Sequence, residues 1–380
     1  IEDEIYISKQ NSMKAFNGDK VLIKILPENE NWKKQEGKIV KILEHGKDRV
    51  VGTFEFSRNF GFVVPDDKSF GTDIFISKSN MGKARNGHKV LVQILKYPEE
   101  NKHAEGEIIE VLGRPNEAGV DMLSLIKEYG LPSEFSEAVI NEAKNKGDKI
   151  DKSKIKGRVD LRDKEIFTID GEDAKDLDDA VRVEKLEDGN YLLEVHIADV
   201  SSYVTQDSLL DKEAYLRGTS IYMLGRVIPM LPRELSNGIC SLNMNEDRFT
   251  LSCSMIINKC GEVIDSKVYK GIIRVTERMN YNDVQKILDR ADEEILKKYE
   301  KYIKQFDLMK ELAIIIKNRR CGKGYINLDL PESKIELDQD GFAVDVHKYE
   351  THFSNEIIEQ FMLTANETIA EKFYWLNAPF

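Results

Sequence analysis

Short runs of valine and isoleucine, bounded by glycine and asparagine, fill the first third of the chain and predict β-strands joined by tight turns. Residues 5–43 are repeated by residues 74–112 at a constant offset without a gap, and about half of the aligned positions are identical. Two copies are too few for a stacked repeat array. The repeat therefore predicts small antiparallel barrels.

Ahead of the second copy, residues 50–64 place phenylalanines in alternation with small or polar residues. Side chains two positions apart on a strand share a face, so we expect Phe60 and Phe62 to project together, with Arg58 close by. Exposed rings beside a cation can bind single-stranded nucleic acid, because bases stack on rings and phosphates meet the charge. The same rings would also fit a barrel core, which is the commoner place for any single phenylalanine.

Beyond residue 113 the apolar pattern becomes partly helical. The strands expected in this part are residues 191–200, 249–257 and 263–275. We expect a long helix in one or two pieces from residue 281 to 320. A final helix should run from Ser354 to about Leu376, capped by Ser354 or Asn355, with one apolar stripe facing the core.

These patterns divide the 380 residues into segments of ordinary domain size. The four segments are a partial first barrel at residues 1–45, a second barrel at 46–113, a helical connector at 114–156 and an α+β domain at 157–380. The hydrophobic share of 41% is enough for real cores.

The net charge of −12 limits how this chain can bind nucleic acid, since phosphate binding normally rests on lysine and arginine. Positive charge must then be local, in a basic groove or on a bound metal. The most basic stretch, residues 317–323, contains Arg319 and Arg320 at an expected helix end. These cations suit a phosphate backbone, and they also suit a helix C-terminus by itself.

The four cysteines form no Cys-x-x-Cys pair, which argues against zinc and favours a reducing compartment. No apolar run approaches the length that a membrane span needs. We therefore expect a cytoplasmic protein with no membrane partner, and a monomer.

The most informative stretch is residues 168–181, where six acidic residues fall within ten positions. Apolar residues lead in and out, so the acids are expected on a loop between two strands. Carboxylates packed together repel one another, and a bound cation removes that cost. Hard divalent ions prefer oxygen ligands, and Mg²⁺ binds through a few carboxylates, water and phosphate. Such a site suits phosphodiester hydrolysis.

The alternative interpretation is a solvated acidic loop, which is what most acidic runs are. Two details favour the metal site: Leu177 and other apolar residues interleave with the acids, and Lys175 is the only cation among them. The run does not have the order of an EF-hand loop.

The sequence Thr-Ile-Asp-Gly-Glu-Asp-Ala-Lys-Asp-Leu-Asp-Asp-Ala-Val at 168–181 resembles the active-site signature of the RNB family, the ribonuclease II and ribonuclease R exoribonucleases. Further stretches similar to that family follow in the same order, at residues 196–201, 228–236, 240–242 and 354–366. The resemblance implies processive, hydrolytic digestion of single-stranded RNA from the 3′ end, with release of nucleoside 5′-monophosphates.

The resemblance also implies roles for the aspartates. Asp170 and Asp179 would be direct Mg²⁺ ligands, with Mn²⁺ as an alternative ion. Asp176 and Asp178 would bind or position metal-bound water, and Asp178 should be the residue most sensitive to substitution. The two remaining acids of the run fall at variable positions of the family pattern and are expected at the surface.

Other positions correspond to RNA contacts of the family. Tyr222 matches an aromatic residue that stacks near the scissile phosphate, although a tyrosine here could equally serve packing. A second stacking aromatic is usual about where Leu328 stands, and Tyr325 is the nearest ring. His196 and Asp199 could be taken for an acid–base pair, but flanking apolar residues predict that His196 is a hydrogen-bonded interior residue.

The resemblance implies a multidomain fold, with small OB-fold (cold-shock) β-barrels followed by an α+β RNB catalytic domain that is incomplete at its C-terminal side. Residues 60–64 and 73–77 look like the paired RNA-binding strands of cold-shock domains. We expect the chain to be a portion of a longer protein, because a family arginine motif, a glutamate and an S1 domain have no counterpart. The alternative function is an RNA-binding or regulatory protein whose RNB domain is inactive.

Overall fold

A computed structural model describes residues 4–27, 35–98, 102–326 and 332–378. The chain forms two compact units. The first comprises Ile1–Ser133, Met223–Arg226 and Ile335–Asp345, and the second comprises Glu134–Tyr222, Val227–Lys334 and Val346–Phe380. Among the described residues, no helix is both long enough and apolar enough to span a membrane.

The first unit opens with a three-stranded sheet in the order β1-β3-β2. Its strands are β1 (Tyr6–Ile7), β2 (Lys20–Ile25) and β3 (Glu36–Glu44). β1 pairs with β3 in parallel, and β2 pairs with β3 antiparallel. The corresponding strands of the second copy pair in the same way, which confirms that the sequence repeat is a structural one.

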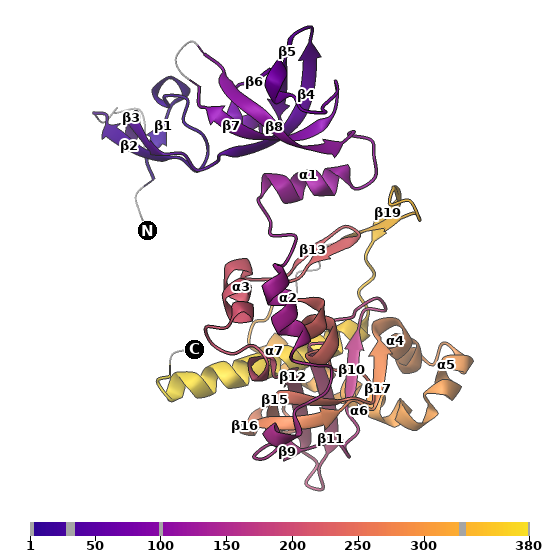
Figure 1. Cartoon of the computed structure of the whole chain (residues 1–380). Coiled ribbons are helices and arrows are strands. Elements are labelled where there is room, and N and C mark those ends of the chain that lie inside the picture. Colours follow the sequence, from indigo (N-terminus) through magenta and orange to yellow (C-terminus); the bar gives the residue numbers. More distant parts are fainter. Residues whose placement is uncertain (1–3, 28–34, 99–101, 327–331, 379–380) are drawn as a thin grey trace. The chain divides into compact units, whose positions relative to one another are not determined.

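The second copy and the two strands ahead of it form a closed barrel in the order β4-β5-β6-β8-β7 (Figure 1). Its strands are β4 (Arg49–Ser57), β5 (Phe60–Pro65), β6 (Ile74–Ser77), β7 (Lys89–Lys96) and β8 (Ala104–Gly113). Phe54 is fully buried in its core. A Cβ atom on Gly61 would lie 2.4 Å from the Phe54 ring, so only glycine leaves room for this core. The predicted OB-type barrel is confirmed.

The expected helical connector is shared by the two units. Helix α1 (Val120–Glu128) packs its Val120 against the buried Val51 and Leu91 of the barrel. Helix α2 (Glu137–Lys144) is capped by Ser136, whose hydroxyl accepts a hydrogen bond from the amide of Val139. This helix packs within the second unit.

The second unit is built on a seven-stranded sheet in the order β17-β10-β11-β12-β15-β16-β9 (Figure 1). Its strands are β9 (Val159–Asp160), β10 (Phe167–Asp170), β11 (Asp179–Lys185), β12 (Tyr191–Ala198), β15 (Asp247–Ile257), β16 (Val263–Arg274) and β17 (Glu277–Asn280). Two further strand pairs are divided between the two units, β13 (Ile221–Met223) with β14 (Arg226–Ile228), and β18 (Ser333–Leu337) with β19 (Ala343–Lys348).

Helices cover one face of this sheet and form the main core of the unit. The helices of the unit after α2 are α3 (Leu209–Arg217), α4 (Tyr281–Asp289), α5 (Glu293–Lys298), α6 (Ile303–Gly322) and α7 (Phe353–Trp375). Phe167 of β10, for example, packs edge-on against Tyr302 at a centroid distance of 5.0 Å. The barrel followed by an α+β domain is the predicted fold class.

Two expected helix boundaries were wrong. The segment 281–320 forms α4, α5 and α6 instead of one or two pieces, because Arg290 adopts a left-handed conformation and Asp292 caps a new helix. The last helix begins at Phe353, one residue earlier than expected. Its cap is His352, whose backbone amide donates to the Asn355 side chain. Ser354 lies inside the helix and donates its hydroxyl to the Tyr281 carbonyl.

The opposite face of the sheet carries buried polar side chains. His196 is fully buried and its Nδ1 forms a 2.8 Å hydrogen bond with Ser252 Oγ, as predicted for an interior residue. Asp199 does not pair with this histidine. It accepts a 2.6 Å hydrogen bond from Arg158, whose guanidinium also stacks on the Phe249 ring. An acid–base pair of His196 and Asp199 is therefore not formed.

Candidate functional site

The acidic run is the connection between two neighbouring strands, as predicted. β10 ends at Asp170 and β11 begins at Asp179, and these strands pair antiparallel through Phe167 and Val181. Asp176 and Asp178 lie in the loop between them. Two of the four carboxylates are thus fixed by strand ends, and the other two depend on how the loop is held.

Ser241 holds the second half of the loop. Its hydroxyl donates to the Lys175 carbonyl at 2.9 Å and accepts from the Leu177 amide at 3.1 Å. The Leu242 amide donates to the Leu177 carbonyl at 2.9 Å, and the Leu177 side chain is fully buried. The apolar anchor expected at Leu177 is therefore present.

Arg278 binds the first half of the loop. It lies on β17, which pairs in parallel with β10 so that Arg278 stands opposite Thr168. Its guanidinium donates to the Glu172 carbonyl at 3.1 Å and to the Ala174 carbonyl at 2.6 Å. Nothing in the sequence spacing identified this arginine, because it is distant from the loop in the chain and adjacent only through the parallel strand pairing.

The four carboxyl groups influence one another electrostatically. Burial and the nearby Asp179 raise the pKa of Asp170 to about 7, against the opposing effect of Arg278. Burial and Asp178 raise the pKa of Asp179 to about 6. Desolvation and Asp176 also raise the pKa of the Asp178 carboxyl, although the residue as a whole remains exposed. Crowded carboxyl groups of this kind favour a bound cation.

The residues fit a hard divalent cation. Within the described part of the chain, the buried Asp170 Oδ2 atom has no hydrogen-bond partner, which leaves it available as a ligand. The four loop aspartates offer carboxylate oxygens, which are the ligand type that Mg²⁺ prefers. Mg²⁺ usually also retains several waters. Asp170 and Asp179 could therefore bind the ion directly, while Asp176 and Asp178 act through water.

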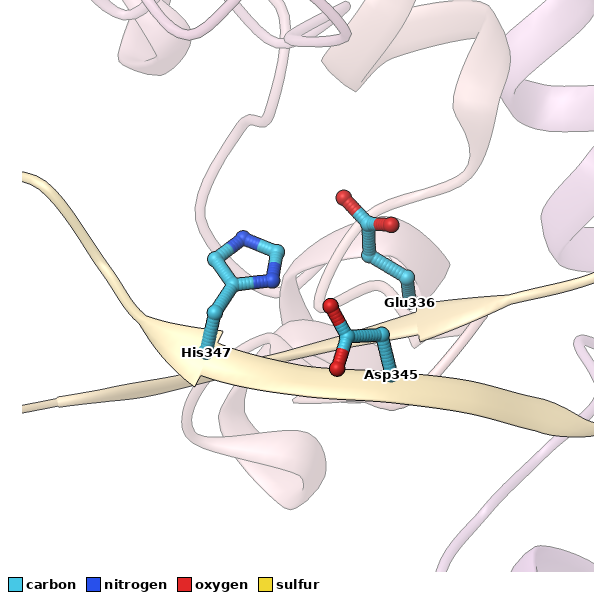
Figure 2. Close-up of side chains that lie close together, drawn as sticks. All are labelled: Glu336, Asp345 and His347. Carbon is cyan, nitrogen blue, oxygen red and sulfur yellow. The ribbon is translucent and has the colours of Figure 1, made fainter.

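A tighter cluster of metal-binding residue types lies on the β18–β19 hairpin. Glu336, Asp345 and His347 offer ligand atoms within 4.8 Å of one another, and Figure 2 shows their side chains on two neighbouring strands. This is the only such group of three among the described residues, so the four loop aspartates are spaced more widely. Glu336 and Asp345 are exposed, and exposed acidic groups are common without a metal.

Tyr222 lies beside the acidic loop. Its hydroxyl donates a 2.6 Å hydrogen bond to Asp176 Oδ2, and this bond together with burial raises the pKa of Tyr222 to about 12. The residue is 67% exposed, so most of its ring faces solvent. A stacking role for Tyr222 stays a prediction.

A cleft of about 780 Å³ opens next to the loop. Residues 171–174 form part of its wall, so the acids at 172 and 173 are exposed along it. Lys334 and Lys348 add positive charge, and Tyr281 adds a ring. Burial and the charges of Asp170 and Asp179 raise the pKa of Tyr281 to about 12. The sequence analysis did not single out Tyr281.

Comparisons with known proteins agree with this geometry. The family model described as RNB domain matches residues 158–380, which is more than half of the chain. The chain belongs to the RNB family. Models described as Cold shock domain and Ribonuclease B OB domain match residues 62–136 and 1–42.

The chain is similar in sequence and structure to proteins named ribonuclease R. It is 42% identical to ribonuclease R of Thermotoga maritima over 100% of this chain and 53% of the relative. A solved structure titled Mycoplasma genitalium RNase R in complex with ribose methylated single-stranded RNA superposes with a TM-score of 0.89, at 27% identity, over 98% of this chain and 58% of that one. The chain thus spans about half the length of such relatives.

A more distant structure shares the fold alone. Yeast Ssd1, titled a pseudonuclease, superposes with a TM-score of 0.66 at 17% identity, over 95% of this chain and 45% of that one. Because the fold alone does not imply an activity, the function of this chain has to be argued from the side chains of the site.

The RNB chain carries its predicted aromatic residues on the barrel of the first unit. Phe60 is 38% exposed, Phe62 is half-buried and Arg58 is exposed. The Phe60 and Phe62 rings lie 5.7 Å apart, and each lies 5.8 Å from Phe75 on β6. His103 packs edge-on against Phe62 at 5.6 Å. Sequence reasoning missed the last two residues, although Phe75 stands in the expected partner strand.

The basic end of α6 is engaged within the protein. Arg320 donates to Glu367 of α7 at 2.6 Å, and its side chain is 12% exposed. Arg319 is half-buried. RNA contacts by these two residues stay predictions. Leu328 lies outside the described residues, and Tyr325 donates a 3.3 Å hydrogen bond to Glu359.

Proposed function

We propose that the chain supplies the nucleic-acid barrel and the acidic site of a hydrolytic 3′-to-5′ exoribonuclease, which degrades single-stranded RNA processively to nucleoside 5′-monophosphates. The observation that carries the proposal is a single loop with four aspartates, of which Asp170 has its pKa raised to about 7 and Asp179 to about 6. Crowding these carboxyl groups costs free energy and perturbs their pKa values, as is common at catalytic sites.

The site is assigned to Mg²⁺, with Mn²⁺ as a substitute. When bound, such an ion makes a water nucleophilic near neutral pH and takes up charge on the attacked phosphate. Asp170 and Asp179 would hold the ion from the strand ends. Asp176 and Asp178 would bind or position metal-bound water, and by resemblance to the family Asp178 would be the residue most sensitive to substitution.

The RNA strand is held by residues on either side of the scissile phosphate. The Tyr222 ring stacks on a base near the 3′ end, and its hydroxyl bond to Asp176 keeps that ring beside the loop. The cleft next to the loop, with Lys334 and Lys348, takes the phosphate backbone. Contacts to several nucleotides persist while one is removed, which accounts for processivity.

The aromatic surface of the barrel also binds RNA. Phe60, Phe62 and Phe75 form a sequence-tolerant stacking platform, with Arg58 available to a phosphate. The Mycoplasma genitalium relative, whose title names a complex with single-stranded RNA, supports RNA as the ligand class. We also propose a cytoplasmic, monomeric protein without a membrane partner, which light scattering and fractionation would test.

The second candidate function is an RNA-binding protein with an inactive RNB domain. It is favoured by the fold shared with a protein described as a pseudonuclease. The loop argues for the active protein, because all four aspartates of the RNB pattern are present and two of them have strongly raised pKa values.

The test is Asp178→Asn in the protein expressed from the complete gene. We expect RNA binding to survive, and release of nucleotide to fall by about a thousandfold or more, because a catalytic contact made in the transition state is lost. Asp188→Asn is the matched control, since Asp188 is an exposed turn residue that binds the Asn190 amide. Equal nucleotide release by Asp178→Asn and wild type would reject the catalytic assignment.

A further inference from the structure

Side chains from elsewhere in the unit form hydrogen bonds with the backbone of the acidic loop at two places. Ser241 binds it at Lys175 and Leu177, beside the buried Leu177 side chain. In the first half, residues 171–173 are exposed, and the half-buried Ala174 makes a small apolar contact with the core at the end of this half. The Ala174 amide donates a hydrogen bond to the Gly171 carbonyl, but this bond lies within the turn and cannot fix the turn relative to the sheet.

Arg278 provides that connection to the sheet. Its Nη2 atom donates to two carbonyls of this half of the loop, at 2.6 and 3.1 Å, from a strand that pairs directly with β10. Asp170, the end of β10, stands opposite Asn280, two residues after Arg278 on the same strand. One rigid element therefore positions both the start of the loop and the strand that carries Asp170.

We propose that Arg278 is a positioning residue of the metal site: by binding the Glu172 and Ala174 carbonyls it fixes the loop that connects Asp170 to Asp176. The inference rests on the proposed function, because it assigns the loop to a metal ion. Arg278 itself touches neither the reacting phosphate nor a carboxylate by any described hydrogen bond. Outer residues of this kind commonly change metal affinity by about 10- to 100-fold when replaced.

Two variants of Arg278 separate the effect of its hydrogen bonds from the effect of its charge. The Arg278→Met variant keeps the aliphatic stem but removes both hydrogen bonds and the charge. The Arg278→Lys variant keeps the charge and offers one compact ammonium group, which cannot reproduce a planar guanidinium on two carbonyls. The control is Arg274→Met, because Arg274 is also an exposed arginine near the end of a strand but pairs with Asp247.

The first measurement is amide hydrogen exchange of the peptide 171–178 in the metal-free chain. We expect exchange about tenfold faster in Arg278→Met, intermediate in Arg278→Lys and unchanged in Arg274→Met. Peptides from β12 should exchange at the wild-type rate in all variants, which separates loop positioning from a general loss of stability. Unchanged exchange of 171–178 in Arg278→Met would overturn the proposal, and if that variant does not fold, unchanged exchange in Arg278→Lys would overturn it.

The second measurement is Mn²⁺ binding, followed by electron paramagnetic resonance, and the Mg²⁺ concentration that gives half-maximal nucleotide release. The Mn²⁺ dissociation constant and the half-maximal Mg²⁺ concentration should each rise about tenfold in Arg278→Met, with a smaller rise in Arg278→Lys. Wild-type metal affinity in Arg278→Met would overturn the assignment of Arg278 alone. A wild-type protein that neither binds Mn²⁺ nor releases nucleotides would instead overturn the proposed function.

Discussion

Lowering the pH should destabilise the sheet through His196. Burial holds the pKa of this imidazole at about 4 instead of 6.5, with a smaller opposing effect from Glu194. Between pH 6.5 and 4 the unfolded chain binds a proton that the folded protein does not, so the free energy of unfolding falls as the pH decreases through this window. The full loss corresponds to about 3 kcal/mol, and it is absent above pH 6.5.

The comparison is between wild type and His196→Gln, whose amide can still bind Ser252. Hydrogen exchange of β12 and β15 amides, corrected for intrinsic rates and measured at pH 7, 5.5 and 4.5, reports the stability of this sheet. Wild type should lose most of the 3 kcal/mol on acidification, beyond any loss in the variant. His88→Gln, in the barrel, controls for histidine replacement. Parallel pH dependences of wild type and His196→Gln would refute the reasoning.

Three further changes test the barrel and the loop. Gly61→Ala should destabilise the barrel by about 1–3 kcal/mol, because the new Cβ atom meets the Phe54 ring. Thermal unfolding measures this, with Gly322→Ala as the control because open space surrounds that position, and an unchanged barrel would contradict the prediction. Phe60→Ala should weaken single-stranded RNA binding by about 1–3 kcal/mol at unchanged stability, in a fluorescence titration. Ser241→Ala leaves two backbone groups of the loop unpaired, so nucleotide release should fall about tenfold while RNA affinity is retained.

The sequence predicted the parts of the site that are contiguous in the chain. The acidic run between two apolar stretches predicted a loop between strands, and Asp170 and Asp179 stand at the strand ends that bound it. The repeat predicted the barrel, because identical strand and turn residues at a fixed offset can hardly form different structures. These features depend on local patterns, which a single sequence displays directly.

The supporting residues could not be predicted because they depend on the order of strands in the sheet. Arg278 reaches the loop only because β17 pairs in parallel with β10, and no periodicity in the sequence specifies that pairing. Arg158 and Asp199 pair across the sheet for the same reason. Helix ends were also uncertain: the left-handed Arg290 divides a segment whose apolar pattern runs on without interruption.

The arrangement explains how the fold tolerates four carboxylates on one loop. Repulsion among them would open a loop that was held only by its own turns, and the cost would appear as disorder at the site. Here the two outer aspartates belong to strands of one sheet, whose apolar face is packed against α4, α6 and α7. Ser241 and Arg278 then hold the intervening backbone from opposite halves. Packing in the main core of the unit therefore keeps the strand ends in place despite the repulsion between the carboxylates. A bound cation can reduce that repulsion without any rearrangement of the strands.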